Sequence, residues 1–145
     1  VSLSSDGSTV AIGAYGNDAN GTYSGHVRIY QNVSGTWTQL GADIDGEAAG
    51  DQSGESVSLS SDGSTVAIGA YGNEANGSLS GHVRIYQNVS GTWTQLGADI
   101  DGEALGDLSG YSVSLSSDGR TVAIGAHHND GNGSYSGHVR IYEIK

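Results

Sequence analysis

The sequence predicts an all-β protein made of tandem four-stranded antiparallel blades of the β-propeller type. The segment that begins at Val1 recurs at Val57 and again at Val113, which is a period of 56 residues. Each period contains four short segments with the apolar alternation of strands, separated by clusters of Gly, Ser, Asn and Asp. No segment has the 3.6-residue apolar period of a helix. Four strands at a period of about 50 residues are typical of a propeller blade.

The repeat divides the chain into copies at residues 1–56, 57–112 and 113–145, of which the last is partial. The first two copies differ at six positions, which are Asp18/Glu74, Thr22/Ser78, Tyr23/Leu79, Ala49/Leu105, Gln52/Leu108 and Glu55/Tyr111. A chain of 145 residues at this period supplies about 2.6 blades, whereas closed propellers typically use about 4 to 8. A single blade would leave both faces of its sheet in water, so we expect neighbouring repeats or other chains to complete the assembly.

The first two strands of each blade are expected to form a hairpin. Residues 1–4 alternate Val and Leu with serine, which is the period of a half-buried strand. The Gly-containing turn 5–8 leads to the second strand at 9–14. This strand places Val10 and Ile12 on one face and small residues on the other, where a neighbouring sheet could approach closely.

The third and fourth strands follow a polar loop. The third strand, 26–30, directs Val27 and Ile29 to one face and its polar residues and tyrosine to the other. The fourth, 37–44, opens with a tryptophan and alternates less strictly. A loop rich in glycine and acidic residues, 45–56, then leads to the next copy.

Composition and charge exclude several classes of function. The chain has no Cys, Pro, Met or Phe, and 16 acidic residues face 5 basic ones for a net charge of −11. This charge repels phosphate, so neither nucleic acid nor an anionic membrane surface is expected as a partner. No apolar run reaches the length of about 20 residues that a membrane helix needs. Because the chain begins with Val and carries no signal peptide, we expect a processed product or a piece of a longer chain.

A known repeat family shares the motif of each copy. The residues Gly-Glu-Ser-Val-Ser-Leu-Ser at 54–60, followed by Val-Ala-Ile-Gly-Ala at 66–70, resemble the FG-GAP repeat. The likeness extends over every copy and so over essentially the whole chain. The resemblance implies a β-propeller, since this repeat builds the seven-bladed propeller of integrin α subunits. It also implies a location at the cell surface, because the repeat recurs in many bacterial and algal surface proteins.

The copies depart from the family motif at three places. The Phe-Gly of the family is Ser-Gly at 53–54 and 109–110, and its Gly-Ala-Pro is Gly-Ala-Tyr at 13–15 and 69–71, with His in place of Tyr in the last copy. The integrin-type calcium loop lies between the first two strands and needs several spaced Asp or Asn residues. The hairpin 5–8 has a single carboxylate, so the resemblance carries no calcium site to it.

A different acidic loop is a candidate for calcium binding. Carboxylates occupy positions 1, 3, 5 and 9 of a Gly-bearing segment in both full copies, and they are Asp43, Asp45, Glu47 and Asp51, repeated as Asp99, Asp101, Glu103 and Asp107. Calcium binds six to eight hard oxygen ligands, which this spacing could supply. The alternative is that these are solvated turn residues whose carboxylates bind nearby backbone amides.

Five N-x-Ser/Thr sequons lie in expected loops, at Asn20, Asn32, Asn76, Asn88 and Asn132. A secreted eukaryotic protein would be expected to carry glycan at some of them. The alternative is that Asn, Gly and Ser are good turn formers and that repetition has multiplied two chance matches.

Histidine and tryptophan recur at fixed places in the repeat. His26, His82 and His138 share a strand face with Arg and Tyr, and we expect them to be structural side chains hydrogen-bonded between strands. Adjacent His127 and His128 occur only in the last copy and are a weak indication of a metal site. The tryptophans are expected to pack between blades, with a glycan-stacking platform as the alternative.

The repeat pattern does not favour catalysis. There is no Cys nucleophile and no Gly-x-Ser-x-Gly motif, and an active site needs one asymmetric constellation rather than the same groups in every copy. We expect an extracellular structural or adhesive protein that associates with neighbouring repeats or chains, as a building block of a surface layer or filament. The alternative is an integrin-like or lectin-like propeller, in which the positions that vary between copies tune the binding of protein or glycan.

Overall fold

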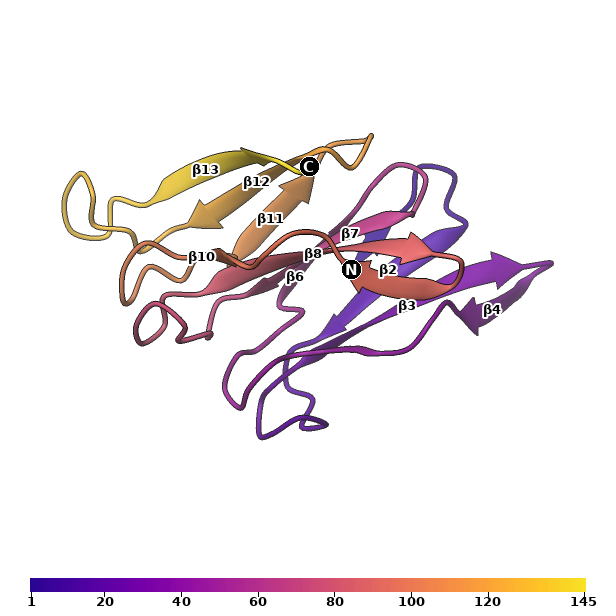
Figure 1. The fold of residues 1–145 in the computed structure, drawn as a ribbon, viewed down its shortest axis with the longest axis horizontal. Helices are drawn as coiled ribbons and strands as arrows, with labels where there is room; N and C mark the ends of the chain where they lie inside the picture. Colours follow the sequence, from indigo (N-terminus) through magenta and orange to yellow (C-terminus); the bar gives the residue numbers. More distant parts are fainter.

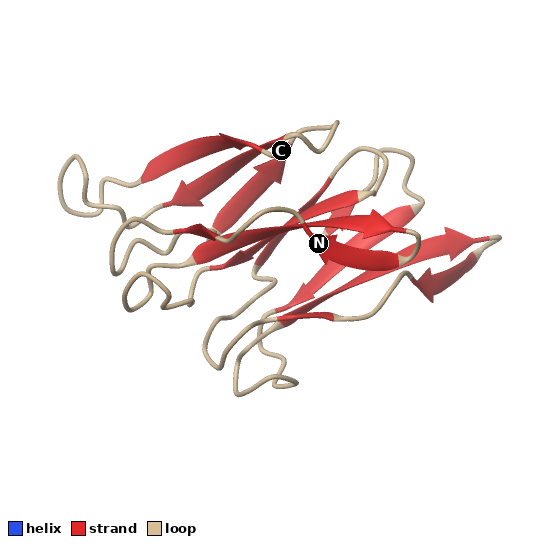
Figure 2. Ribbon diagram, viewed as in Figure 1, coloured by secondary structure: helices blue, strands red, loops and turns tan.

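The computed structural model describes residues 1–145, and its thirteen strands form three antiparallel sheets without any helix (Figure 2). The sheets follow one another across the molecule, from the first copy in indigo and purple to the third in orange and yellow (Figure 1). No helical segment long and apolar enough to cross a membrane is present. The prediction of an all-β fold with repeated four-stranded blades is confirmed.

The first sheet is built from the first copy. Its strands are β1 (Ser2–Leu3), β2 (Thr9–Ala14), β3 (His26–Val33), β4 (Thr36–Gln39) and β5 (Ile44–Asp45). Strands β1 to β4 form a meander in which each strand pairs with the next, and β5 also pairs with β3. The register places Ala11 opposite Ile29 and Gly13 opposite Val27, so these four residues share one face of the sheet.

The second and third sheets repeat this arrangement. The second contains β6 (Ser56–Leu59), β7 (Thr65–Ala70), β8 (His82–Val89), β9 (Thr92–Gln95) and β10 (Ile100–Asp101), and the third contains β11 (Ser112–Leu115), β12 (Thr121–Ala126) and β13 (His138–Glu143). The second strand of the three blades begins at Thr9, Thr65 and Thr121, which is the 56-residue spacing of the sequence.

The fourth strand of each full blade differs from the expected single segment at 37–44. It is divided into β4 and β5, which pair with opposite ends of β3. Between them Gly41 has a φ of +77°, a left-handed conformation that interrupts an extended strand. The chain stays beside β3 in this interval, because the Leu40 amide donates a hydrogen bond to the Ile29 carbonyl (2.7 Å).

The third strand is longer than the expected 26–30 and continues to Val33. It is joined to β4 by a two-residue turn at Ser34 and Gly35, whose φ angles are +53° and +88°. Positive φ at both central residues is the mark of a type I′ turn, whose twist matches that of the strands it joins. The Gly35 amide also bonds the side-chain oxygen of Asn32 (2.8 Å), which closes the turn.

The apolar core lies between blades rather than within one. The first interface contains Ala11, Val27, Ile29 and Ile44 of the first blade and Leu59, Val66, Ile68 and Tyr86 of the second. The second interface contains Ala67, Val83 and Ile85 of the second blade and Leu115, Val122 and Ile124 of the third. Each blade therefore offers one face with small residues on its second strand and an opposite face with larger ones, and the two kinds of face pack against each other.

An aspartate closes the hairpin between the first two strands of each blade. Asp6 Oδ1 accepts hydrogen bonds from Ser4 Oγ (2.8 Å), the Ser8 amide (2.9 Å) and Ser8 Oγ (2.8 Å). The bond from the Ser8 amide, followed by those from the two hydroxyls, lowers the pKa of Asp6 to about 2. The equivalent amide and hydroxyls lower the pKa of Asp62, and the Ser116 hydroxyl together with the Arg120 amide lowers that of Asp118.

Acid is expected to weaken the fold through these three aspartates. A carboxyl whose pKa is lower in the folded chain than the unfolded value of about 3.9 stabilises the fold above that value. The contribution disappears as the pH falls toward the folded pKa, so the free energy of unfolding in urea should decline below about pH 4. The variant with Asp6→Asn, Asp62→Asn and Asp118→Asn should be less stable at neutral pH and decline less steeply. Equal declines in the two proteins would contradict this.

Candidate functional site

A histidine begins the third strand of every blade and faces carboxylates. His82 opens β8, and the register places Asp101 of β10 opposite it. Asp99 lies just before β10, and Glu47 comes from the loop after β5 in the preceding blade. His82 Nδ1 lies 3.9 Å from Glu47 Oε2, 3.8 Å from Asp99 Oδ2 and 4.0 Å from Asp101 Oδ1. This cluster, here named the His82 cluster, therefore joins groups from two blades.

The imidazole of His82 is buried without a hydrogen-bond partner. Its side chain is 0% exposed, and neither ring nitrogen forms a hydrogen bond, so the interstrand bond expected for this residue is not formed. Burial, followed by the charge of Arg84, lowers the pKa of His82, although Asp99 and Glu47 act in the opposite direction. Burial thus favours the neutral ring, in which one nitrogen carries a free lone pair.

The arginine two residues along the strand has different partners in the first and second copies. Arg28 forms a bidentate pair with Asp43, with both N–O distances at 2.9 Å. The Arg28 hydrogen bond holds the pKa of Asp43 below its usual value. Arg84 instead reaches the preceding blade and donates to the backbone carbonyl of Asp45 (2.7 Å). Asp99, the counterpart of Asp43, is thereby left without an arginine and faces the buried imidazole.

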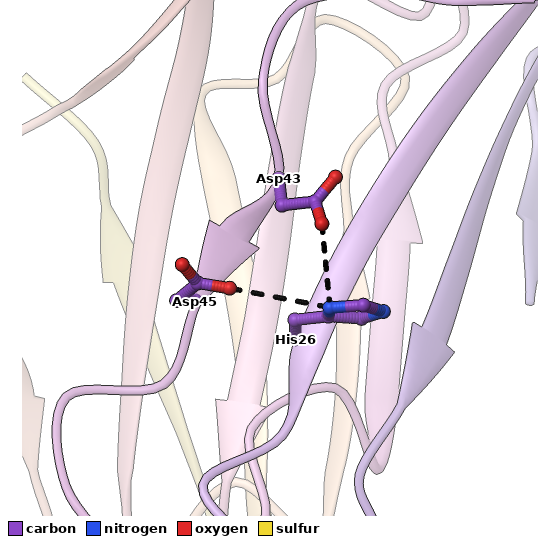
Figure 3. Close-up of side chains that lie close together, drawn as sticks. All are labelled: His26, Asp43 and Asp45. Atoms are coloured by element: carbon purple, nitrogen blue, oxygen red, sulfur yellow. Dashed lines mark ion pairs between the residues drawn. The ribbon is translucent and has the colours of Figure 1, made fainter. Parts of the chain in front are cut away.

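The first and third copies contain partial versions of the same cluster. His26 Nδ1 lies 3.6 Å from Asp43 Oδ2 and 4.0 Å from Asp45 Oδ1, and Figure 3 shows the ring facing both carboxylates. This cluster contains His26 with two aspartates and no glutamate. In the third copy, His138 Nδ1 lies 3.8 Å from Glu103 Oε2 of the preceding blade, and the His138 side chain is 25% exposed.

The acidic residues considered for calcium do not form one contiguous loop site in each copy. They gather in three groups, with Asp43 and Asp45 at His26, with Glu47 and Asp99 at His82, and with Glu103 and Asp107 at His138. Asp51 is buried, where it accepts hydrogen bonds from the Ala48 amide (3.1 Å) and from Asn73 Nδ2 of the next blade (3.2 Å). Each group thus includes an imidazole, whose proximity to the carboxylates does not follow from their spacing in the sequence.

Two blade faces at the ends of the array are open. The first blade exposes Ile12 (40%) and Trp37 (47%), which line an apolar pocket with Val10 and Tyr30. In the second blade the counterpart Trp93 instead packs against the first interface.

The opposite face is open on the third blade. Val139 and Ile141 are 66% and 70% exposed there, while their counterparts in the first blade, Val27 and Ile29, are fully buried against the second blade. Where two faces of these kinds pack inside the array, the contact is close. Trp93 Nε1 of the second blade donates a hydrogen bond to the Leu40 carbonyl of the first blade (2.7 Å).

The positions that vary between copies gather at one end of the blades. Backbone hydrogen bonds from Gly50 to the Thr22 carbonyl and from Gln52 to the Tyr23 carbonyl, both 2.9 Å, hold the loop after β5 against the loop after β2. These two loops carry all six differing positions. Variation is therefore concentrated on one surface, while the blade faces keep the same residues.

A row of aromatic rings crosses this end between the second and third blades. The ring centroids of Tyr71 and Tyr111 are 5.4 Å apart, and those of Tyr111 and His127 are 4.3 Å apart. His127 lies 4.2 Å from His128, which lies 4.8 Å from Tyr135. The paired histidines of the last copy therefore belong to a row of tilted and edge-to-face rings and not to the acidic clusters.

The sequon asparagines have different environments. Asn20 Nδ2 donates to the carbonyls of Gly46 (2.8 Å) and Glu47 (3.0 Å), and Asn76 makes the equivalent bonds. This is the atom that would carry a glycan, so these two side chains cross-link loops in the manner of turn residues. Asn88 is half-buried, whereas Asn32 and Asn132 are exposed. Glycosylation remains a prediction.

Comparisons with known proteins agree with this architecture. The family model described as "FG-GAP repeat" matches residues 42–86 and 98–142, which together are more than half of the chain. Among solved structures, hydrazine synthase of Kuenenia stuttgartiensis is similar over 98% of this chain, with a TM-score of 0.59 and 17% sequence identity. The chain spans 32% of the length of that protein, and at this identity the likeness concerns the fold alone. No curated protein sequence matches the chain.

Proposed function

Because the chain belongs to the FG-GAP repeat family, whose repeats form β-propeller-type modules, we propose that it is a non-catalytic extracellular module that assembles by stacking blades end to end. Its role in this proposal is structural or adhesive, as a building block of a surface layer or filament. Binding surfaces repeated at a fixed spacing suit such a role, since many weak contacts act together.

One observation carries the proposal: the strands on the two open faces of the array have the same residues as the corresponding strands that pack together inside it, although the partial third copy lacks counterparts of Leu40 and Ile44. Val10, Ile12, Tyr30 and Trp37 of the first blade correspond to Val66, Ile68, Tyr86 and Trp93, which pack against a preceding blade. The open face of the third blade presents Ala123, Val139 and Ile141, the counterparts of Ala11, Val27 and Ile29. The third blade of one chain can therefore receive the first blade of another in the geometry already used within the chain.

This contact joins two different surfaces and is therefore heterologous. Such contacts repeat from one chain to the next until they close into a ring or extend as an open filament. Contact between chains would bury apolar side chains that are now exposed to water. Each large apolar side chain that becomes buried contributes about 2 kcal/mol of transfer free energy. The same reasoning applies if further repeats of a longer chain cover these faces, since the strands of each repeat carry the same apolar residues.

Aspartate on either open face is expected to weaken the association of chains. In sedimentation experiments the wild-type chain should form oligomers that grow with protein concentration. Ile12→Asp and Ile141→Asp should each weaken association by at least about tenfold, because burying an unpaired carboxylate is costly. A mixture of the two variants should form heterodimers that do not extend, since each retains one intact face.

Leu105→Asp is the matched control, because Leu105 is 74% exposed in a loop away from both faces. It should associate as the wild type does. A wild-type chain that remains monomeric at high concentration, or a mixture of Ile12→Asp and Ile141→Asp that forms no dimer, would overturn end-to-end stacking.

A second candidate function is recognition of a protein or glycan at the loop end of the blades. It is favoured by the concentration of varying positions there and by the aromatic row through Tyr111 and His127. Aromatic rings offer flat apolar surfaces for stacking with a ligand. A glycan array separates the two candidates, since a ligand of the loop end would be lost on Tyr111→Ala and retained on Ile12→Asp.

A further inference from the structure

The His82 cluster has an unusual feature for the interior of a protein. A fully buried imidazole without any hydrogen bond faces three carboxylates at 3.8 to 4.0 Å. Buried polar groups are normally paired, because leaving them without partners costs free energy. The distances are too long for direct hydrogen bonds. They are close to the separation of about 3 to 3.5 Å expected between two ligands that bind one ion at about 2.1 Å.

We propose that Glu47, His82 and Asp99, with Asp101 beside them, bind one divalent first-row transition ion of the Zn²⁺ class across the boundary between the first and second blades. The ligand atoms of Glu47, His82 and Asp99 all lie within 4.8 Å of one another. His82 Nδ1 points into the group from its buried side, and the carboxylates approach from the partly exposed side. An ion at this position would give Nδ1 the partner it lacks.

Charge supports a divalent ion. The cluster contains three carboxylates, and the guanidinium of Arg84 is the nearby cation, with Nη1 3.5 Å from Glu47 Oε1. Two negative charges therefore remain uncompensated, which one divalent cation would balance. Arg84 faces only the Oε1 atom, so Glu47 Oε2 remains directed at His82.

The donor set selects the class of metal. Calcium and magnesium prefer oxygen ligands alone, whereas an imidazole nitrogen together with carboxylates suits zinc and neighbouring transition ions. His82 Nδ1 has no hydrogen-bond partner, so it is available as the nitrogen donor of this set.

Blade stacking creates this site. In the first copy, where no other blade is packed on this side in the structure, Arg28 occupies both oxygens of Asp43. In the second copy Arg84 turns to the preceding blade, which frees Asp99 and places Glu47 beside His82. A bound ion would therefore cross-link the two blades and stabilise their interface.

Metal titration of the untagged, chelator-treated chain tests the proposal. Calorimetry with Zn²⁺ should show one saturable high-affinity site per chain, and Co²⁺ should bind competitively with a visible absorption band. Glu47→Gln and Asp99→Asn change partly exposed side chains, so these variants should fold, and each should raise the dissociation constant for Zn²⁺ at least about tenfold. His82→Asn should abolish the site, with folding checked by circular dichroism.

The double variant His127→Ala with His128→Ala is the control, because these residues lie in the aromatic row outside the cluster. It should bind Zn²⁺ as the wild type does, and excess Ca²⁺ should not displace Co²⁺. Absence of saturable Zn²⁺ binding by the wild type, or binding that Glu47→Gln and Asp99→Asn leave unchanged, would overturn the proposal. Loss of binding in the double variant alone would also overturn it, since the paired histidines would then be the site.

Discussion

Replacing Gly69 with alanine is expected to destabilise the chain by about 3 kcal/mol, near the upper end of overpacking penalties. A Cβ at this position would overlap the backbone carbonyl of Gly110 and the Ser56 hydroxyl, which itself donates to that carbonyl (2.7 Å). The backbone around Gly110 cannot rotate away, because its amide is bonded to the Gly125 carbonyl (3.1 Å) in the next blade. The melting temperature should fall on the order of 10 °C.

Gly125 provides the matched control within the same chain. It occupies the equivalent position in the third blade, where an added Cβ meets only the flexible end of Ser112 closely. Gly125→Ala should therefore change the free energy of unfolding by less than about 1 kcal/mol, since the serine can rotate and alanine reduces the entropy of the unfolded chain. Equal destabilisation by the two substitutions in urea unfolding would show that the close approach of the Gly110 backbone to Gly69 is not the cause of the lost stability.

Gly69 also shows how far the fold could be predicted from the sequence. The alternation of Val66 and Ile68 with Ala67 and Gly69 predicted both the strand and a face open to close approach. Period and strand count then predicted the blade. The division of the fourth strand was missed, because its cause is the positive φ of Gly41, which a single glycine in a polar segment does not reveal.

The candidate site was only partly predictable, for a reason that lies in its construction. The acidic residues were recognised by their spacing, but each was assigned to a loop of its own copy. Glu47 in fact meets His82 of the next blade, and this contact depends on how two sheets stack. A strand register could have indicated part of the site. When the third strand pairs with the segment at Asp45, that residue lies opposite His26. That register depends on the divided fourth strand, so missing the division also hid the approach of the aspartates to the histidine.

Truncation of Ile68 to alanine is expected to cost about 3 kcal/mol, as for other fully buried isoleucines whose loss leaves a cavity. Ile68 is 1% exposed and packs between the first and second blades. Ile124 occupies the same position one repeat later, is also 1% exposed and should respond equally to Ile124→Ala. Urea unfolding of the dilute chain, compared with wild type, measures both effects.

Ile12 is the third member of this set and separates folding from assembly. Its residue type and its position in the repeat are those of Ile68, yet it is 40% exposed because no blade covers it. In the dilute chain, Ile12→Ala should therefore cost less than about 1 kcal/mol. At concentrations where chains associate, the same substitution should weaken association, since stacking would bury Ile12 as Ile68 is buried. A large loss of stability from Ile12→Ala in the dilute monomer would mean that this face is already covered within the chain, and an unchanged association constant would mean that stacking does not use it.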